Sequence, residues 1–145
     1  MVKIEVSTVI NRPLEEVFAF MSNPENDPQW QSETSETELT SQGPVGVGST
    51  YRDVGFFLGR RIESVYEFTE FEPNKKFSLK TTSGPLPIEA TISYEALEEG
   101  TQVNFLAQGE VGGFFKVAEP LVSRMAQRTW VANYANLKDL LETES

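Results

Sequence analysis

One change of hydrophobic period constrains the fold of this 145-residue chain more than any other feature. From Thr50 to Gly112, apolar and polar residues alternate in stretches separated by turn residues, which predicts a meander of antiparallel strands with one solvated face. After Gly112-Gly113 the period becomes helical, and we expect residues 120–141 to form the longest helix. A helix of that length, about 33 Å, can cross a whole sheet.

The alternation predicts which residues share the apolar face of the sheet. This face comprises Ile62, Ser64, Tyr66, Phe68, Phe77, Leu79, Ile88, Ala90, Ile92, Tyr94, Val103, Phe105 and Ala107. On the opposite face we expect the glutamates to be solvated: Glu63, Glu67, Glu89 and Glu95. The long helix offers a matching apolar face, formed by Ala118, Leu121, Val122, Met125, Ala132, Leu137 and Leu140. The sheet is therefore expected to curve around this helix.

The first 49 residues predict one secure strand, two short helices and one weak strand. Residues 3–10 alternate as a half-buried strand, and the sequence RPLEEVFAFM that follows is helical in its spacing. Pro24 and Pro28 then allow only a short second helix. Threonines favour a strand over residues 32–40, before a turn-rich loop. Two short helices cannot cover a sheet, so we expect them to close one end of it.

Composition excludes several classes of function. The net charge of −10 repels nucleic acid and anionic lipid surfaces, so neither is expected as a partner. The chain has no cysteine and no histidine, and we therefore expect no transition metal and no cofactor. Its apolar runs are far shorter than the ~20 residues of a membrane span, and no signal-peptide block is visible, so we expect a cytoplasmic protein without membrane insertion.

Several motifs in the sequence resemble the START-like, or SRPBCC, superfamily, most closely its small polyketide cyclase/dehydrase-like bacterial members. They are INRPLEEVFAFMSNPENDPQW, GVGSTYR, EFEPNKKFSLKTTSG, YEALEEGTQVNF and the terminal NLKDLLE. The resemblance implies an α+β helix-grip fold over residues 1–145 as a single domain, with about six to seven strands curved around the C-terminal helix. It also implies an apolar cavity that holds lipids, polyketides or related molecules. Function transfers less readily, since one fold can host binding, transport and catalysis.

A cavity between sheet and helix would be lined by a definite set of side chains. The ligand-binding residues we expect are Trp30, Arg52, Phe56, Tyr66, Phe68, Leu79, Ile92, Tyr94, Phe105, Met125, Thr129 and Asn133. Ordinary core packing is the alternative for most of them. Trp30 is expected to be partly buried at the cavity mouth beside Phe18. Arg52, in register with Val54 and Phe56, either meets an anionic head group or pairs with a surface glutamate such as Glu63.

Three functions remain open at this point. The first is binding of a small hydrophobic molecule in the cavity. The second is a cyclase or dehydratase in which Tyr66, Tyr94, Arg52 or Asn133 polarises an enol or carbonyl. The third is a protein-interaction or co-chaperone-type module, and a homodimer is also possible. A roomy pocket favours the first two functions, whereas a dry pocket of a few tens of Å³ favours the third.

Overall fold

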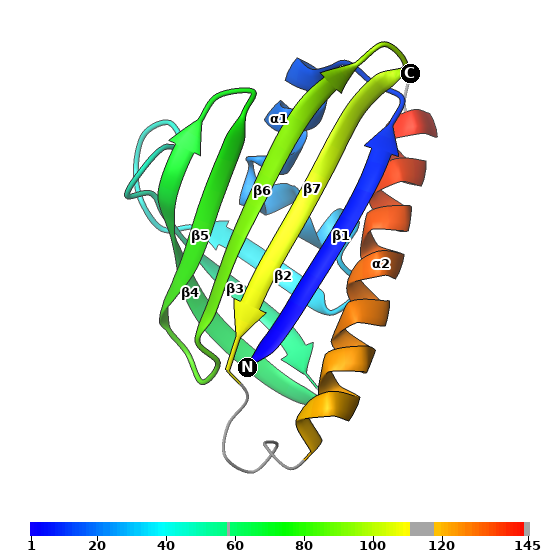
Figure 1. Ribbon diagram of the computed structural model, residues 1–145. Coiled ribbons are helices and arrows are strands. Elements are labelled where there is room, and N and C mark those ends of the chain that lie inside the picture. The colour runs from blue at the N-terminus through cyan, green and yellow to red at the C-terminus, as the bar shows by residue number, and fades with distance from the viewer. Residues whose placement is uncertain (58, 111–117, 144–145) are drawn as a thin grey trace.

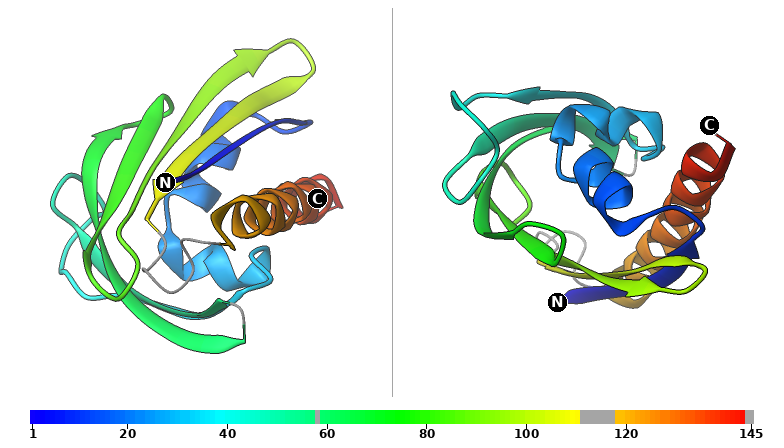
Figure 2. Two further views of the ribbon diagram at one scale, coloured as in Figure 1. Left: turned by 60° about the horizontal axis from the view of Figure 1, so that its bottom comes forward. Right: turned by 90° about the horizontal axis from the view of Figure 1, so that it is seen from above.

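The computed structural model describes residues 1–57, 59–110 and 118–143. In chain order the elements are β1 (Val2–Ile10), α1 (Leu14–Met21), the 3₁₀ helix η1 (Pro24–Gln29), β2 (Thr34–Leu39), β3 (Thr50–Phe57), β4 (Arg60–Glu72), β5 (Lys76–Ser83), β6 (Ile88–Leu97), β7 (Gly100–Gly109) and α2 (Glu119–Thr143). The seven strands form one antiparallel sheet in the order β1-β7-β6-β5-β4-β3-β2. Figure 2 shows this sheet curling around the three helices, which all lie on its concave side.

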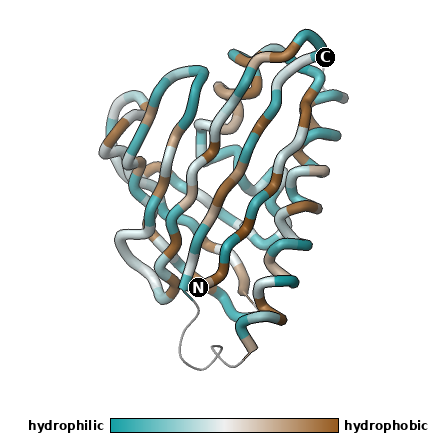
Figure 3. The backbone as a smooth tube through the Cα atoms, in the orientation of Figure 1, coloured by the Kyte–Doolittle hydropathy of each residue, from teal (hydrophilic) through white to brown (hydrophobic). Residues whose placement is uncertain are grey.

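The predicted apolar face of the sheet is confirmed from β4 to β7. Phe68, Phe77, Ile92 and Val103 are buried, and Phe77 lies opposite Ile92 in the register between β5 and β6. Hydrophobic and hydrophilic residues alternate along the strands in Figure 3, as a sheet with one solvated face requires. The outward glutamates Glu63, Glu89 and Glu95 are exposed and Glu67 is half-buried.

The two short helices close one end of the sheet, as the prolines predict. α1 ends at Met21, and Asn23 caps η1, because its side chain accepts a hydrogen bond from the backbone N–H of Glu25 at 3.1 Å. Val17, Phe18 and Met21 are the buried residues of α1. The Phe18 ring makes edge contacts with three rings of the sheet: Phe71, Phe77 and Tyr94.

The long C-terminal helix is confirmed, and its predicted buried face is right in part: Val122 and Leu137 are buried and Leu140 packs against the core, whereas Ala118 is exposed. Leu121, Met125 and Ala132 are exposed. Besides Val122, Leu137 and Leu140, the face that packs inward contains Ala126, Trp130, Tyr134 and Leu141, together with Asn133, which was expected to face the cavity. The rings of Trp130 and Tyr134 stack on or tilt against Phe105. Ring contacts therefore set the rotation of this helix.

Polar side chains of α2 fix it along the free edge of β1, where Figure 1 shows it running beside that strand. The amide of Gln127 bridges the backbone of Glu5: its Nε2 donates to the carbonyl at 2.7 Å and its Oε1 accepts from the N–H at 3.2 Å. Lys138 Nζ donates to the carbonyl of Val9 at 2.6 Å. These bonds occupy backbone groups that a free sheet edge would leave exposed.

In the described ranges no helix has the length and apolar character that crossing a membrane requires.

Candidate functional site: a cavity between the sheet and α2

A cavity of about 430 Å³ lies between the concave face of the sheet and α2. Ten of the twelve predicted site residues line it: Trp30, Phe56, Tyr66, Phe68, Leu79, Ile92, Phe105, Met125, Thr129 and Asn133. Further aliphatic lining comes from β1, β6 and β7, through Val2, Ile4, Ile88, Ala90 and Ala107. Pockets that take small organic molecules have this size and this largely apolar lining.

Arg52 and Tyr94, the other two predicted residues, are not among the described residues that line the cavity. Arg52 makes the ion pair expected as its alternative: Nη1 donates to Glu63 at 3.1 Å, and Nη2 donates to Glu36 at 2.8 Å. Tyr94 packs edge-on against Phe18, and its hydroxyl donates to the sulfur of Met21 at 3.5 Å. Both side chains therefore stabilise the structure around the cavity and do not line it.

The sequence left open which face of β3 turns to the cavity, and the structure puts mainly the face opposite Arg52 there, although Phe56 also lines the cavity. Tyr51, Asp53, Gly55 and Phe57 line the cavity, whereas Arg52 takes part in the outer ion pairs. A one-residue slip exchanges the two faces of a strand. Because Asp53 and Gly55 interrupt the apolar pattern of this face, the sequence did not indicate that it turns toward the cavity.

Trp30 is buried more completely than expected. Only 4% of it is exposed, and its ring lies edge-on to Tyr134 and Trp130 of α2, with centroids 5.0 and 6.1 Å away. The predicted partial burial is therefore wrong, and the rings that Trp30 contacts belong to α2. Trp30 joins η1 to α2 and forms an inner wall of the cavity, while exposed Glu33 and Glu110 mark where the lining reaches solvent.

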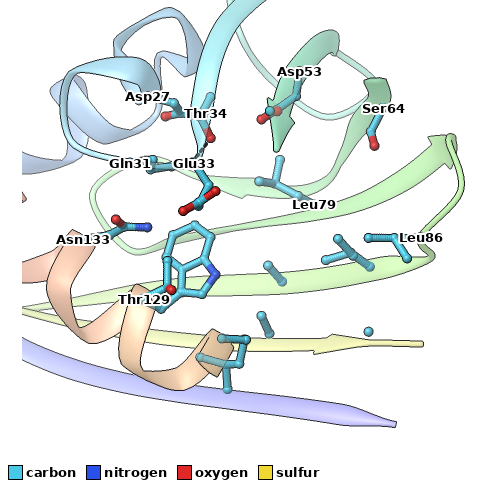
Figure 4. Close-up of a pocket in the computed structure, with 18 of the residues that line it drawn as sticks. Asp27, Gln31, Glu33, Thr34, Asp53, Ser64, Leu79, Leu86, Thr129 and Asn133 are labelled. Carbon is cyan, nitrogen blue, oxygen red and sulfur yellow. Dashed lines mark hydrogen bonds between the residues drawn. The ribbon is translucent and has the colours of Figure 1, made fainter. Parts of the chain in front are cut away.

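Two aspartates that the sequence did not single out lie in the lining. Asp27 is on η1, 8% exposed, and Asp53 is on β3. Figure 4 shows Asp27, Asp53 and Ser64 along one side of the pocket, and Thr129 and Asn133 of α2 along another. An aspartate between two prolines is typical of a solvated turn, so Asp27 carried no signal. For Asp53 the signal was its position between the aromatic residues Tyr51 and Phe57 on one face of β3.

Burial makes both carboxyl groups hold their protons more tightly than usual. Loss of hydration raises the pKa of Asp53 from 3.8 to about 6. It raises the pKa of Asp27 well above its ordinary value, and the neighbouring charge of Asp53 raises it further. Burial, followed by these acidic neighbours, also raises the pKa values of Tyr51 and Tyr66, so their phenols stay neutral. The result is a pair of carboxyl groups whose pKa values are both raised, within electrostatic reach of two neutral phenol hydroxyls.

Other polar groups in the wall differ in how well they are satisfied. Asn133 Oδ1 accepts from the backbone N–H and the hydroxyl of Ser32, at 3.1 and 3.2 Å. Trp30 Nε1 and the Tyr134 hydroxyl are buried and have no hydrogen-bond partner among the described residues. Buried donors without acceptors are costly, at roughly 1–3 kcal/mol each. The wall near Trp30 is therefore less well satisfied than an ordinary core.

Gly55 lets the segment before β2 pack against β3 at the rim of the cavity. A Cβ at this position would lie 2.5 Å from the carbonyl oxygen of Glu33, which accepts the backbone N–H of Phe56 at 2.8 Å. Any larger residue would push that segment outward, so glycine is required here for close approach.

In the part of the chain that the structure describes, no group of three or more acidic side chains has the geometry of a metal site.

The comparisons with known proteins agree with this architecture. The chain belongs to the family described as polyketide cyclase / dehydrase and lipid transport, whose model matches residues 1–142. The comparison with curated proteins returned no match.

Solved structures share the whole fold at low sequence identity. A protein from Thermus thermophilus matches with a TM-score of 0.84 at 19% identity, covering 99% of each chain. A START superfamily protein from Mycobacterium smegmatis matches with a TM-score of 0.83 at 17% identity, covering 100% of each chain. The di-domain ARO/CYC BexL from the BE-7585A biosynthetic pathway matches at 0.74 and 18% identity, over 98% of this chain and 47% of its own. These likenesses establish the START-like helix-grip fold.

Proposed function

We propose that this protein binds a small, mainly apolar molecule in the cavity between the sheet and α2. The observation that carries the proposal is the cavity itself, about 430 Å³ in volume and walled by aromatic and aliphatic side chains. A chain that needed only a stable core would fill such a space, since interiors pack as densely as organic crystals. A volume this large also argues against a module that acts only through its outer surface. Membership of a family named for cyclases, dehydrases and lipid transport supports the same conclusion.

A second candidate is an enzyme that uses the same cavity, in the manner of a cyclase or dehydratase. It is favoured by the pairing of Asp27 with Asp53, whose pKa values are both raised by burial. Two carboxyl groups with different environments can divide the roles of general acid and general base. The phenols of Tyr51 and Tyr66, kept neutral, would donate hydrogen bonds to a polarised carbonyl. Turnover of a bound compound would distinguish this candidate from simple binding.

Displacement of a neutral fluorescent probe, N-phenyl-1-naphthylamine, tests the binding proposal. Ala90 lines the cavity on β6, so Ala90→Leu fills part of the space without touching the outer surface. Ala96 is exposed on the same strand, and Ala96→Leu is the matched control. We expect the unmodified protein and Ala96→Leu to bind the probe, and Ala90→Leu to bind it at least about tenfold more weakly.

Two results would overturn the proposal. One is equal probe affinity in Ala90→Leu and the unmodified protein, with both folded by circular dichroism. The other is the absence of binding by any apolar probe below about a millimolar, which corresponds to only ~4 kcal/mol. Native mass spectrometry of the purified protein then identifies any molecule that copurifies.

A further inference from the structure

We propose that the ligand of this cavity presents a hydrogen-bond donor, a hydroxyl or a protonated amine, to Asp27 and Asp53, and that the cavity rejects anions such as fatty acid carboxylates. This inference rests on the proposed binding function and adds the chemical class of the ligand.

Among the described residues of the lining, the ionisable groups other than tyrosines are all acidic. Asp27 and Asp53 lie inside the cavity, and Glu33 and Glu110 lie where the lining reaches solvent. Among the described lining residues there is no lysine or arginine to receive a carboxylate. Arg52, the cation nearest in sequence to the pair, takes part in the outer ion pairs with Glu36 and Glu63. An anion entering this space would lose its hydration, meet no described lysine or arginine, and be repelled by Asp53 wherever that carboxyl group is ionised.

The acidic pair also lacks donors from the protein. Asp27 is 8% exposed, and the hydrogen bonds that involve it among the described residues are accepted by its backbone carbonyl, from Trp30 and Gln31. Its side chain therefore lies in the wall without a hydrogen-bond partner among the described residues. Buried polar side chains of native proteins are almost always hydrogen-bonded, so an exception calls for an explanation. A donor on the ligand supplies the missing partner.

Unsatisfied groups elsewhere in the same wall are independent evidence that its polar side is incomplete. The Trp30 indole N–H and the Tyr134 hydroxyl are buried without partners among the described residues. Asp27 affects the pKa of the Tyr134 phenol, so these groups are within electrostatic reach of each other. Both acceptors and donors are thus left open in one region of the cavity. A hydroxyl is the group that can donate and accept at once, and an ammonium adds charge complementarity to the aspartates.

Three ten-carbon alkyl compounds distinguish a hydroxyl, an ammonium and a carboxylate head group: 1-decanol, decylamine and decanoate. Each is used to displace N-phenyl-1-naphthylamine at pH 7.5. We expect decanoate to compete at least about tenfold more weakly than the better of the other two. Decanol as the best competitor indicates a hydroxyl donor, and decylamine indicates an ammonium. Decanoate binding as tightly as both would overturn the inference while leaving the binding function intact. Failure of all three, and of the probe, would remove the function itself.

Isosteric variants test whether the two aspartates cause the weaker binding of decanoate. Asp27→Asn and Asp53→Asn remove the carboxyl groups with little change in shape. We expect each variant to reduce the ratio between the affinity of the better competitor and that of decanoate by roughly three- to tenfold. Glu95→Gln removes one negative charge from the exposed outer face of β6, so it controls for the net charge of −10. An equal reduction in Glu95→Gln would show that overall charge, and not the cavity, repels the anion. No reduction in either aspartate variant would also overturn the assignment to the aspartates.

Discussion

The two ends of the curved sheet carry the same alternating pattern but put it to different uses. At the end closed by α1, the buried residues fill the space: Ile10, Val17 and Leu137 have no exposed surface, and Phe18 has 5%. Toward the other end the sheet residues face the cavity, and Leu79, Ile88 and Ala90 stay partly buried. Hydrophobic residues at strand spacing thus show which face of the sheet is buried. The position of the helices decides whether that face is packed into a core or lines a cavity. Three predictions test this difference, from the largest expected effect to the smallest.

The first prediction compares truncation at the two ends. Leu137→Ala at the filled end should lower the free energy of unfolding by about 2–5 kcal/mol, since it leaves a void in packed surroundings. Leu79→Ala, in the cavity wall, should cost only about 1 kcal/mol, because its side chain already lacks neighbours on one side. Urea denaturation with equal m-values measures both losses. Equal losses at the two sites would show that the cavity is collapsed in solution.

The second prediction concerns the pH dependence of stability caused by Asp53. Its pKa is raised from 3.8 to about 6 in the folded protein, so between these values the folded state keeps a proton that the unfolded chain releases. The contribution of this carboxyl group to stability is therefore fully present below about pH 4 and is lost as the pH rises through about 6. Asp53→Asn should remove this loss, and at pH 7 it should be more stable than the unmodified protein by at most about 3 kcal/mol.

The charge of Asp53 raises the pKa of Asp27, so the measurement needs both single variants and the double variant. Glu95→Gln, exposed on the outer face, is the control for losing one negative charge. Thermal unfolding from pH 4 to pH 8 measures the difference in stability between each variant and the unmodified protein. A constant difference between Asp53→Asn and the unmodified protein over this range would contradict the buried position of the carboxyl group.

The third prediction has the smallest effect and separates the two faces of β3. Arg52→Ala removes the ion pairs with Glu36 and Glu63, in which all three side chains are partly exposed. Such surface pairs contribute about 0–1 kcal/mol, so stability should change by no more than that. Affinity for N-phenyl-1-naphthylamine should not change, since Arg52 does not line the cavity. A large loss of affinity would mean that the guanidinium reaches the ligand.

Local pattern alone determined most of the fold and the greater part of the cavity wall. Strand alternation from Ile62 to Ala107 and the prolines after Met21 act over a few residues, so they could be interpreted without knowing what lies opposite. The same holds for the length of α2, which begins near Pro120 and has no internal break. Ten of the predicted site residues line the cavity for this reason.

Only the tertiary structure decided the rotation of α2, the register of β3 and the polarity of the cavity. Each depends on partners far away in the chain: Trp130 on Phe105, and Asp27 on Asp53. In the sequence, Asp27 is a polar residue in a proline-rich turn, and nothing near it indicates burial. It is buried because η1 folds back against β2 on the concave side of the sheet, and the resulting loss of hydration raises its pKa.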